Sequence, residues 1–296
     1  MTGLTPFAPG SAYLELESAP PNPSQALSLI PHNSSLKLTC TVHGPRPLPR
    51  SAPFSPQLLL STHVKYTPFA SRQRRGYIRD AGERDLSVHL EAALRGVIIG
   101  DRWPKSGVEI VVTVLEAEED GWWGDDIGSA AARDIGSWSM MTVLAGCITV
   151  ASAAIVEAGI DCVDLASGGV AALVRSPRDS NLAKARGCEE AGDWTQEHMQ
   201  VVLDPQPGEH EEIVAACVVG YLASRDELTQ VWIKGNIGRS TDMLVDRAVD
   251  AAILARTVLA EVVREGAEAR LPAREKEEIG KTKQTLASTE DVNMSG

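Results

Sequence analysis

Four arginines lie within eight residues of this 296-residue chain, at positions Arg72, Arg74, Arg75 and Arg79. An arginine side chain keeps its charge and donates several hydrogen bonds in one plane, so it suits phosphate oxygens. A cluster of arginines on one loop could therefore bind the backbone of a nucleic acid without reading its bases. The alternative is that these side chains are ordinary solvated charges on a loop. The pattern alone leaves both interpretations open.

A smaller basic stretch follows the segment 35–43, in which apolar and polar residues alternate. This alternation predicts a strand with one buried face, and we expect it to end at Gly44-Pro45, a turn signal. Prolines at positions 45, 47 and 49 stiffen the connection that follows. The same reasoning as above makes Arg46 and Arg50 further candidates for contact with the phosphates of a nucleic acid.

Acidic residues gather at 204–212, where Asp204 is followed by Glu209, Glu211 and Glu212. Such a cluster could bind Mg²⁺ or supply a catalytic carboxylate. The intervening Pro and Gly residues mark an exposed loop, so the sequence favours solvated charges. We expect no metal and no cofactor, because the six histidines have no HxH or HExxH spacing and the five cysteines form no CxxC pair. Trp122-Trp123 could stack on bases, but a packed or partner-facing pair is favoured.

The charge is divided unevenly along the chain. The net charge is −12, yet residues 1–110 carry 12 Lys and Arg against 8 Asp and Glu, whereas residues 111–296 carry 16 against 32. The halves are therefore +4 and −16, which suggests different partners for each. The N-terminus lacks the features of a signal peptide and the chain has no run of 18 apolar residues, so we expect an intracellular soluble protein.

The elements that must position these residues follow from hydrophobic periodicity. Strands alternate with three helices, which predicts an α+β fold of mixed sheets with packed helices. We expect one domain over 1–271, with a loop insertion near 18–26, a polar loop over 176–198 and a disordered charged tail over 272–296. The segment after Asp161 predicts a strand interrupted at Gly168-Gly169. The expected strands are 10–16, 35–43, 57–67, 108–115, 213–222 and 228–234, and the expected helices are 86–97, 138–158 and 241–262.

Several blocks in this order resemble the RNase PH family, and most of all the ring subunits of the eukaryotic RNA exosome. They are GSAYLEL, VHGPRP, TPFA followed by arginines, RDLS at a helix, WPKSGVEIVVTVLEAEEDG, AIVEAGIDCVDLASGG, VVLDPQPGEHEE and ELTQVWIKG, and they span about residues 10–265. The resemblance implies an RNase PH-like domain of the ribosomal protein S5 domain 2-like type. It also implies that the loop holding Arg72–Arg79 approaches the central channel of a ring.

The sequence departs from the family's enzymes at two places. Those enzymes hold inorganic phosphate with arginine and small hydroxyl residues after the Gly-Gly turn, but Gly168-Gly169 is followed here by Val170, Ala171 and Ala172. None of these side chains can donate a charge-assisted hydrogen bond. The family's acid aligns with Ala215, which cannot protonate a leaving oxygen. The resemblance therefore predicts a fold without the catalytic residues.

We expect a non-catalytic ring subunit that contributes to an RNA-threading channel in 3′ to 5′ RNA processing and decay. The implied partners are other RNase PH-like subunits in a hetero-hexameric ring, cap proteins with S1 and KH domains, an associated nuclease and single-stranded RNA, with no membrane. The implied location is the nucleus and nucleolus, and also the cytoplasm. An active phosphate-dependent exoribonuclease and a scaffold without RNA contact remain alternatives. For assembly, we expect segments 138–158 and 108–115 to present edges that a partner covers.

Overall fold

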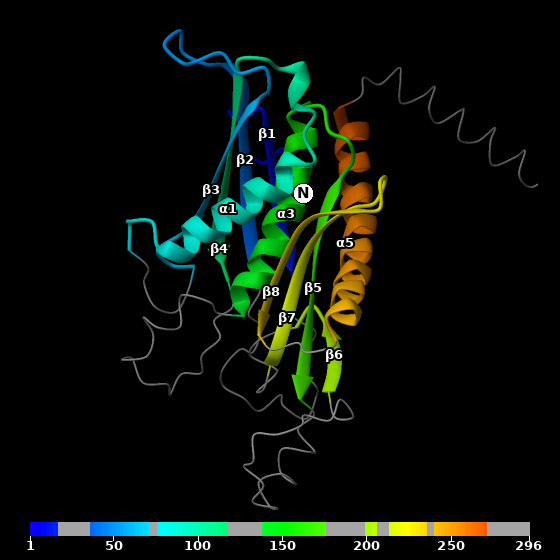
Figure 1. Ribbon diagram of the computed structural model, residues 1–296. Coiled ribbons are helices and arrows are strands. Elements are labelled where there is room, and N and C mark those ends of the chain that lie inside the picture. Colours follow the sequence, from blue (N-terminus) through cyan, green and yellow to red (C-terminus); the bar gives the residue numbers. More distant parts are fainter. Residues whose placement is uncertain are drawn as a thin grey trace, which may run out of the picture.

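Two four-stranded sheets with helices between and beside them make up the fold (Figure 1). The computed structural model describes residues 1–16, 36–70, 76–117, 138–175, 199–205, 213–235 and 240–270. The expected insertion near 18–26, the polar loop 176–198, the tail 272–296 and Trp122-Trp123 lie outside these ranges. Mixed and antiparallel sheets with packed helices confirm the predicted α+β class.

The first sheet has the strand order β1-β2-β4-β3. Strand β3 runs parallel to β4 and every other pair is antiparallel. Parallel neighbours need a crossover connection, and helix α1 supplies it between β3 and β4. The elements are β1 (Gly10–Leu16), β2 (Leu36–Pro47), β3 (Leu59–Tyr66), α1 (Ala81–Arg95), the short 3-10 helix η2 (Gly100–Arg102) and β4 (Ser106–Glu116).

The second sheet is antiparallel throughout, with the order β6-β5-β7-β8. Helices α1 and α3 lie between the two sheets, and α5 covers the other face of the second sheet (Figure 1). The predicted hairpin through Ser224–Asp226 is present as β7 and β8, whereas β6 was not expected from the sequence. The elements are α3 (Ser139–Glu157), β5 (Ala166–Arg175), β6 (Met199–Leu203), β7 (Ile213–Leu222), β8 (Glu227–Gly235) and α5 (Thr241–Arg270).

Helix α3 is the centre of the core. Sixteen of its 19 residues are buried, because it contacts strands of both sheets and both other helices. It is long and apolar enough to cross a membrane, yet it is enclosed by the protein's own elements. The expectation that segments 138–158 and 108–115 present open edges is wrong. Helix α3 is interior, and β4 lies between β2 and β3 with a partner on each side.

Strand β5 corrects a second expectation, because Gly168-Gly169 does not interrupt it. The pair continues the ladder to β7, with Gly168 opposite Gly220 and Gly169 opposite Val219. The two glycines are needed for packing instead. A Cβ on Gly168 would lie 2.3 Å from the carbonyl oxygen of Ala145 in α3, and one on Gly169 would lie 2.2 Å from that of Ala248 in α5. Both faces of β5 therefore touch helix backbone, which only glycine permits.

Strand β2 is also longer than the sequence indicates. It continues past Gly44-Pro45 to Pro47, because a β-bulge absorbs the break. His43 pairs with Glu109, and Arg46 pairs with Gly107. The two residues Gly44 and Pro45 on β2 therefore lie opposite the single residue Val108 on β4. Gly44 has a φ of 132°, and a Cβ there would meet the carbonyl oxygen of Gly107 at 2.7 Å. The bulge extends the strand and leaves Arg46 exposed at its end.

Candidate nucleic-acid interface

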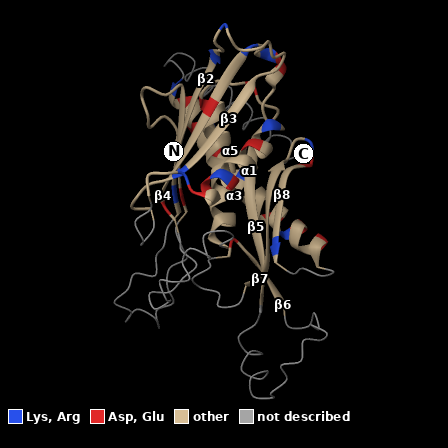
Figure 2. Cartoon of the chain, turned by 60° about the vertical axis from the view of Figure 1, so that its left-hand side comes forward, with Lys and Arg blue, Asp and Glu red and all other residues tan. Residues whose placement is uncertain are grey.

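Arg46 and Arg50 lie at one end of the first sheet, whereas the described Arg79 follows a segment that leaves the sheet from its other end. Arg46 pairs with Gly107 at the start of β4, and exposed Arg50 follows it. Tyr66, at the end of β3, lies beside Val114 near the end of β4, and the arginine-rich segment leaves from there. Val114 is seven positions further along β4 than Gly107, or about 23 Å at roughly 3.3 Å per residue. Figure 2 shows basic positions at the top of the sheet and others near α1.

Of the arginine-rich segment, Arg79 is within the described residues and is partly exposed. Arg72, Arg74 and Arg75 lie outside them, so their assignment remains a prediction. Arg84, one turn into α1, is exposed and donates a hydrogen bond from its guanidinium to the carbonyl of Arg79 at 3.5 Å. The structure therefore places a second arginine, which sequence reasoning did not select, beside the predicted one.

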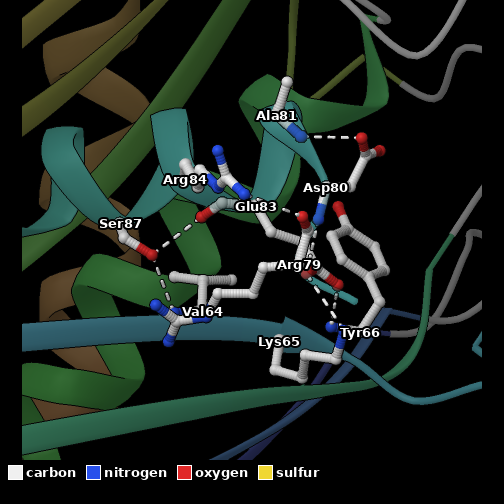
Figure 3. Close-up of polar contacts among 9 residues, drawn as sticks. All are labelled: Val64, Lys65, Tyr66, Arg79, Asp80, Ala81, Glu83, Arg84 and Ser87. Carbon is white, nitrogen blue, oxygen red and sulfur yellow. Dashed lines mark hydrogen bonds and ion pairs between the residues drawn. The ribbon is translucent and has the colours of Figure 1, made fainter. Parts of the chain in front are cut away.

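Glu83 closes the base of the segment that carries these arginines (Figure 3). Its side chain is 2% exposed, and its carboxylate accepts hydrogen bonds from the backbone N–H of Tyr66 at 2.9 Å and of Asp80 at 3.2 Å. The ammonium group of Lys65 is 3.2 Å from the same carboxylate. One buried carboxylate thus joins the two ends of residues 67–79. Tyr66 and Asp80 are thereby held close to each other at the end of the first sheet.

The start of α1 is fixed by the same contacts. Asp80 is the N-cap, and its side chain together with that of Glu83 forms a capping box. Ser87 then ties the helix to β3, because its hydroxyl donates to the carbonyl of Glu83 at 2.7 Å and accepts from the N–H of Val64 at 2.9 Å. Sequence reasoning missed Glu83, although the D-x-x-E spacing of Asp80 and Glu83 at a helix start was a usable signal.

The positions that correspond to the family's phosphate site and acid lie on adjacent strands. Val170, Ala171 and Ala172 on β5 are at most 1% exposed, and Ala215 on β7 is fully buried. Ala215 pairs with Leu173, the residue after Ala172. The fold therefore brings the two positions together, as it must for chemistry, but none of the four side chains has a group that can bind phosphate or transfer a proton.

Asp204 is the one candidate carboxylate of the 204–212 cluster that the structure describes. Its backbone N–H donates to the carbonyl of Val170 at 3.0 Å, so it lies beside the position of the missing phosphate site. The residue is exposed as a whole, yet burial of its carboxyl group raises the pKa, against a lowering by a hydrogen bond to the backbone of Val170. A carboxylate at this place repels phosphate. Glu209, Glu211 and Glu212 lie outside the described residues.

The four cysteines in the described part of the chain are shielded from water to different degrees. Cys40, Cys147, Cys162 and Cys217 are free thiols, and burial raises the pKa of Cys147 and Cys162 to about 12. A thiol that does not ionise is neither a nucleophile nor a metal ligand. Across these residues no group of three or more His, Cys, Asp or Glu could hold a metal ion. His89 stacks on Trp232 with ring centroids 4.7 Å apart, which joins α1 to β8.

The fold and the residues of this site agree with comparisons with known proteins. The sequence profile of the 3′ exoribonuclease family, domain 1, also called RNase PH, matches residues 1–161. A protein of Chaetomium thermophilum named exosome complex component MTR3 is 49% identical over 271 residues, which cover 89% of this chain and 83% of the relative. The chain belongs to the RNase PH family. The positions of PKSG and the long apolar strand predict likeness to the mRNA transport regulator (Mtr) subunit in particular, and this match confirms it.

Other relatives point the same way. Schizosaccharomyces pombe has a protein named exosome complex component mtr3 that is 26% identical over 259 residues, covering 85% of this chain and 78% of the relative. The crystal structure of rice Rrp46 superposes with a TM-score of 0.58 at 14% identity, covering 89% of this chain and 92% of that one. At that identity the likeness to Rrp46 concerns the fold alone.

Proposed function

We propose that this chain is a non-catalytic ring subunit of the RNA exosome that helps to form the channel for single-stranded RNA. The observation that carries the proposal is the 49% identity to a protein named exosome complex component MTR3 over most of both chains. Its proposed partners are other RNase PH-like chains in a hetero-hexameric ring, cap proteins and an associated nuclease. We propose the nucleus, nucleolus and cytoplasm as its location.

The non-catalytic part of the proposal is supported by the residues at the phosphate and acid positions. Phosphorolysis requires an anion site beside the reacting phosphorus and an acid for the leaving oxygen. Val170, Ala171, Ala172 and Ala215 supply neither, and Asp204 adds negative charge beside them. An active exoribonuclease would have to place both functions elsewhere.

Assembly with other chains is supported by exposed apolar side chains on the second sheet. Strand β8 is an edge strand, and its Val231 and Ile233 are 40% and 37% exposed. Val231 and Ile233 pair with Val219 and Cys217, whose side chains pack toward α5. Val231 and Ile233 therefore lie on the same face of the sheet as α5, but α5 does not cover this edge of it. Leu254 and Val258 of α5 are also more than half exposed. Edge strands with apolar neighbours are suited to pairing with another chain.

The RNA part of the proposal predicts a charge effect. Replacing Arg72, Arg74 and Arg75 by Glu should weaken binding of single-stranded RNA by the whole assembly, because each lost phosphate contact removes a counterion-release contribution. The slope of log affinity against log salt should fall by about 0.7 for each contact, or roughly 2 for three. Titrations with two unrelated RNA sequences should give the same change, since phosphate contacts do not read bases.

The matched control replaces Arg247 and Arg264 on α5 by Glu, because these arginines form exposed ion pairs with residues of their own helix. These changes should leave the salt slope as it is in the unaltered assembly. An unchanged salt slope in the triple variant, with normal assembly, would mean that Arg72, Arg74 and Arg75 are solvated charges that do not contact RNA. Loss of assembly would instead assign them to a subunit interface.

A further inference from the structure

Basic residues gather with exposed apolar side chains where β2 ends and β4 begins, at the top of Figure 2. Arg46 of β2 pairs with Gly107 of β4, and Gly107 pairs with Leu59 of β3 on its other side. Residues paired across strands point to the same face, so Arg46 and Leu59 share one face with a glycine between them. It is the outer face, because Thr62 points to the other face and its hydroxyl donates to the carbonyl of Ser87 in α1. Arg46 is exposed there, and Leu59 is 54% exposed.

Lys105 brings two further cations to this end through its backbone. Its carbonyl accepts a hydrogen bond from the N–H of Leu48 at 3.0 Å. Arg46 and Arg50 are each two residues from Leu48, so the Cα atoms of both lie within about 7 Å of the Cα of Leu48. Arg50 is exposed, and Lys105 is partly exposed. Three cations are therefore gathered around one backbone hydrogen bond.

The backbone of Lys105 adopts a conformation that favours glycine. Its φ is 54°, which is strained for a residue with a Cβ. The N–H of Lys105 donates to the carbonyl of Ser55 at 2.9 Å, so hydrogen bonds on both sides hold this conformation. Phe54, the residue before Ser55, is 74% exposed. A lysine that is retained where glycine fits better indicates a use for its charge, here close to an exposed ring.

The charges at this end favour an acidic partner. None of the three cations forms an ion pair with another residue in the part of the chain that the structure describes. Of the nearby acidic residues, Asp161 pairs with Arg102, and Glu109 lies 3.5 Å from His63. Asp101 is the remaining exposed acid close by. The surface therefore keeps an excess of positive charge that a partner with several carboxylates can neutralise.

The side-chain types favour a protein segment over RNA. Arginine and aromatic residues are enriched in protein interfaces. Sequence-independent binding of single strands uses several rings on which successive bases stack, but Phe54 is the one exposed ring within the described ranges 46–59 and 100–107. Prolines at positions 47, 49, 53 and 56 add apolar surface and few hydrogen-bonding groups. These surroundings give Arg46 and Arg50 a different ligand from the nucleic acid that the sequence suggests.

We propose that Arg46, Arg50, Phe54, Leu59 and Lys105, here called the basic end surface, bind an extended acidic segment of a partner protein outside the ring. Carboxylates of the segment pair with the three cations, and an apolar side chain of the segment packs against Phe54 or Leu59. The proposal goes beyond the proposed function and does not depend on RNA binding.

The test measures binding of a fluorescein-labelled polyglutamate peptide with one central phenylalanine to the intact assembly, by fluorescence anisotropy. Arg46→Glu with Arg50→Glu should weaken binding by about 10-fold or more, because two attractions become repulsions. Phe54→Ala should weaken binding of this peptide, but not of a peptide with serine in place of its phenylalanine. The matched control is Arg247→Glu with Arg264→Glu on α5, which should leave binding unchanged.

Lys105→Gly separates loss of charge from damage to the fold. The variant should bind the peptide more weakly, yet its midpoint of urea unfolding should not fall, because glycine relieves the positive φ. Lys105→Arg keeps the charge and should retain binding. Weaker binding that occurs only together with lower stability would overturn the role given to this cation.

The remaining outcomes decide what occupies the basic end surface. Unchanged peptide affinity in the Arg46→Glu, Arg50→Glu variant overturns the proposal. An oligouridylate of the same length serves as the second probe. If it displaces the peptide and itself loses affinity in that variant, the surface is an RNA contact, which also overturns the proposal. A variant ring that fails to assemble shows that a ring neighbour covers the surface, with the same consequence. None of these results changes the expected effect of Arg72, Arg74 and Arg75 on RNA binding, so the two proposals can fail separately.

Discussion

Gly168→Ala should lower the free energy of unfolding by about 3 kcal/mol or more, and Gly168→Val should prevent folding. The added Cβ would lie 2.3 Å from the carbonyl oxygen and 2.5 Å from the Cα of Ala145. These are backbone atoms of the buried helix α3, so no side-chain rotation relieves the overlap. Either α3 or β5 must move, and β5 cannot retreat because Gly169 touches the backbone of α5 on its other face. Urea unfolding of the purified chain measures the change.

Gly96→Ala is the matched control for this prediction. Gly96 caps α1 with ordinary helical angles, and a Cβ there would meet the side chain of Thr229 at 3.5 Å, a normal contact. Its stability should change by less than about 1 kcal/mol, and a small gain is expected because alanine restricts the unfolded chain. Equal stability of the two alanine variants would show that β5 and α3 are not packed as closely as the structure describes.

Glu83→Ala should lower the free energy of unfolding by about 3 to 5 kcal/mol, although it removes only one polar side chain. The reason is that the N–H groups of Tyr66 and Asp80 and the ammonium group of Lys65 lose a shared acceptor inside the protein. Glu83→Gln keeps one carbonyl oxygen and should lose less. Hydrogen exchange at Tyr66 and Asp80 should become faster in both variants, since these amides are held by the altered side chain.

Glu91→Ala serves as the control on the same helix. Glu91 forms an ion pair with Arg95 one turn away, and Arg95 is largely exposed. Such pairs contribute well under 1 kcal/mol, so this variant should unfold almost like the unaltered protein. A Glu83→Ala variant that is as stable as Glu91→Ala would mean that Glu83 does not hold the loop base.

Periodicity predicted most of the elements because it depends only on local sequence. The alternation in 35–43 and the helical spacing from Leu86 to Val97 both correspond to observed elements. It failed where a distant element decides the outcome. In the sequence, Gly168-Gly169 resembles a break in a strand, but the pair is there because α3 and α5 pack closely against β5. Gly44-Pro45 resembles the end of a strand, but a bulge opposite β4 allows β2 to continue. The sequence around each glycine does not show which distant element packs against it.

The candidate site was predictable in part. That the positions of Val170 to Ala172 and Ala215 come together was implied by the family resemblance, and the ladder of β5 and β7 accounts for it. The separation of Arg46 and Arg50 from Arg79 could not be predicted, because it depends on the register of three strands. Glu83 was missed because a buried glutamate is unexpected from composition, and two of its three partners are backbone groups that every sequence has.

The most direct test of the central claim is an assay for phosphorolysis. The chain, purified with whichever neighbours keep it soluble, is incubated with single-stranded RNA and inorganic phosphate, and released nucleoside diphosphates are measured. Because its phosphate and acid positions hold Val170, Ala171, Ala172 and Ala215, we predict that this chain contributes no product. Asp204→Asn should then leave any background activity of its neighbours unchanged. Phosphate-dependent release of nucleoside diphosphates that Asp204→Asn abolishes would contradict the account.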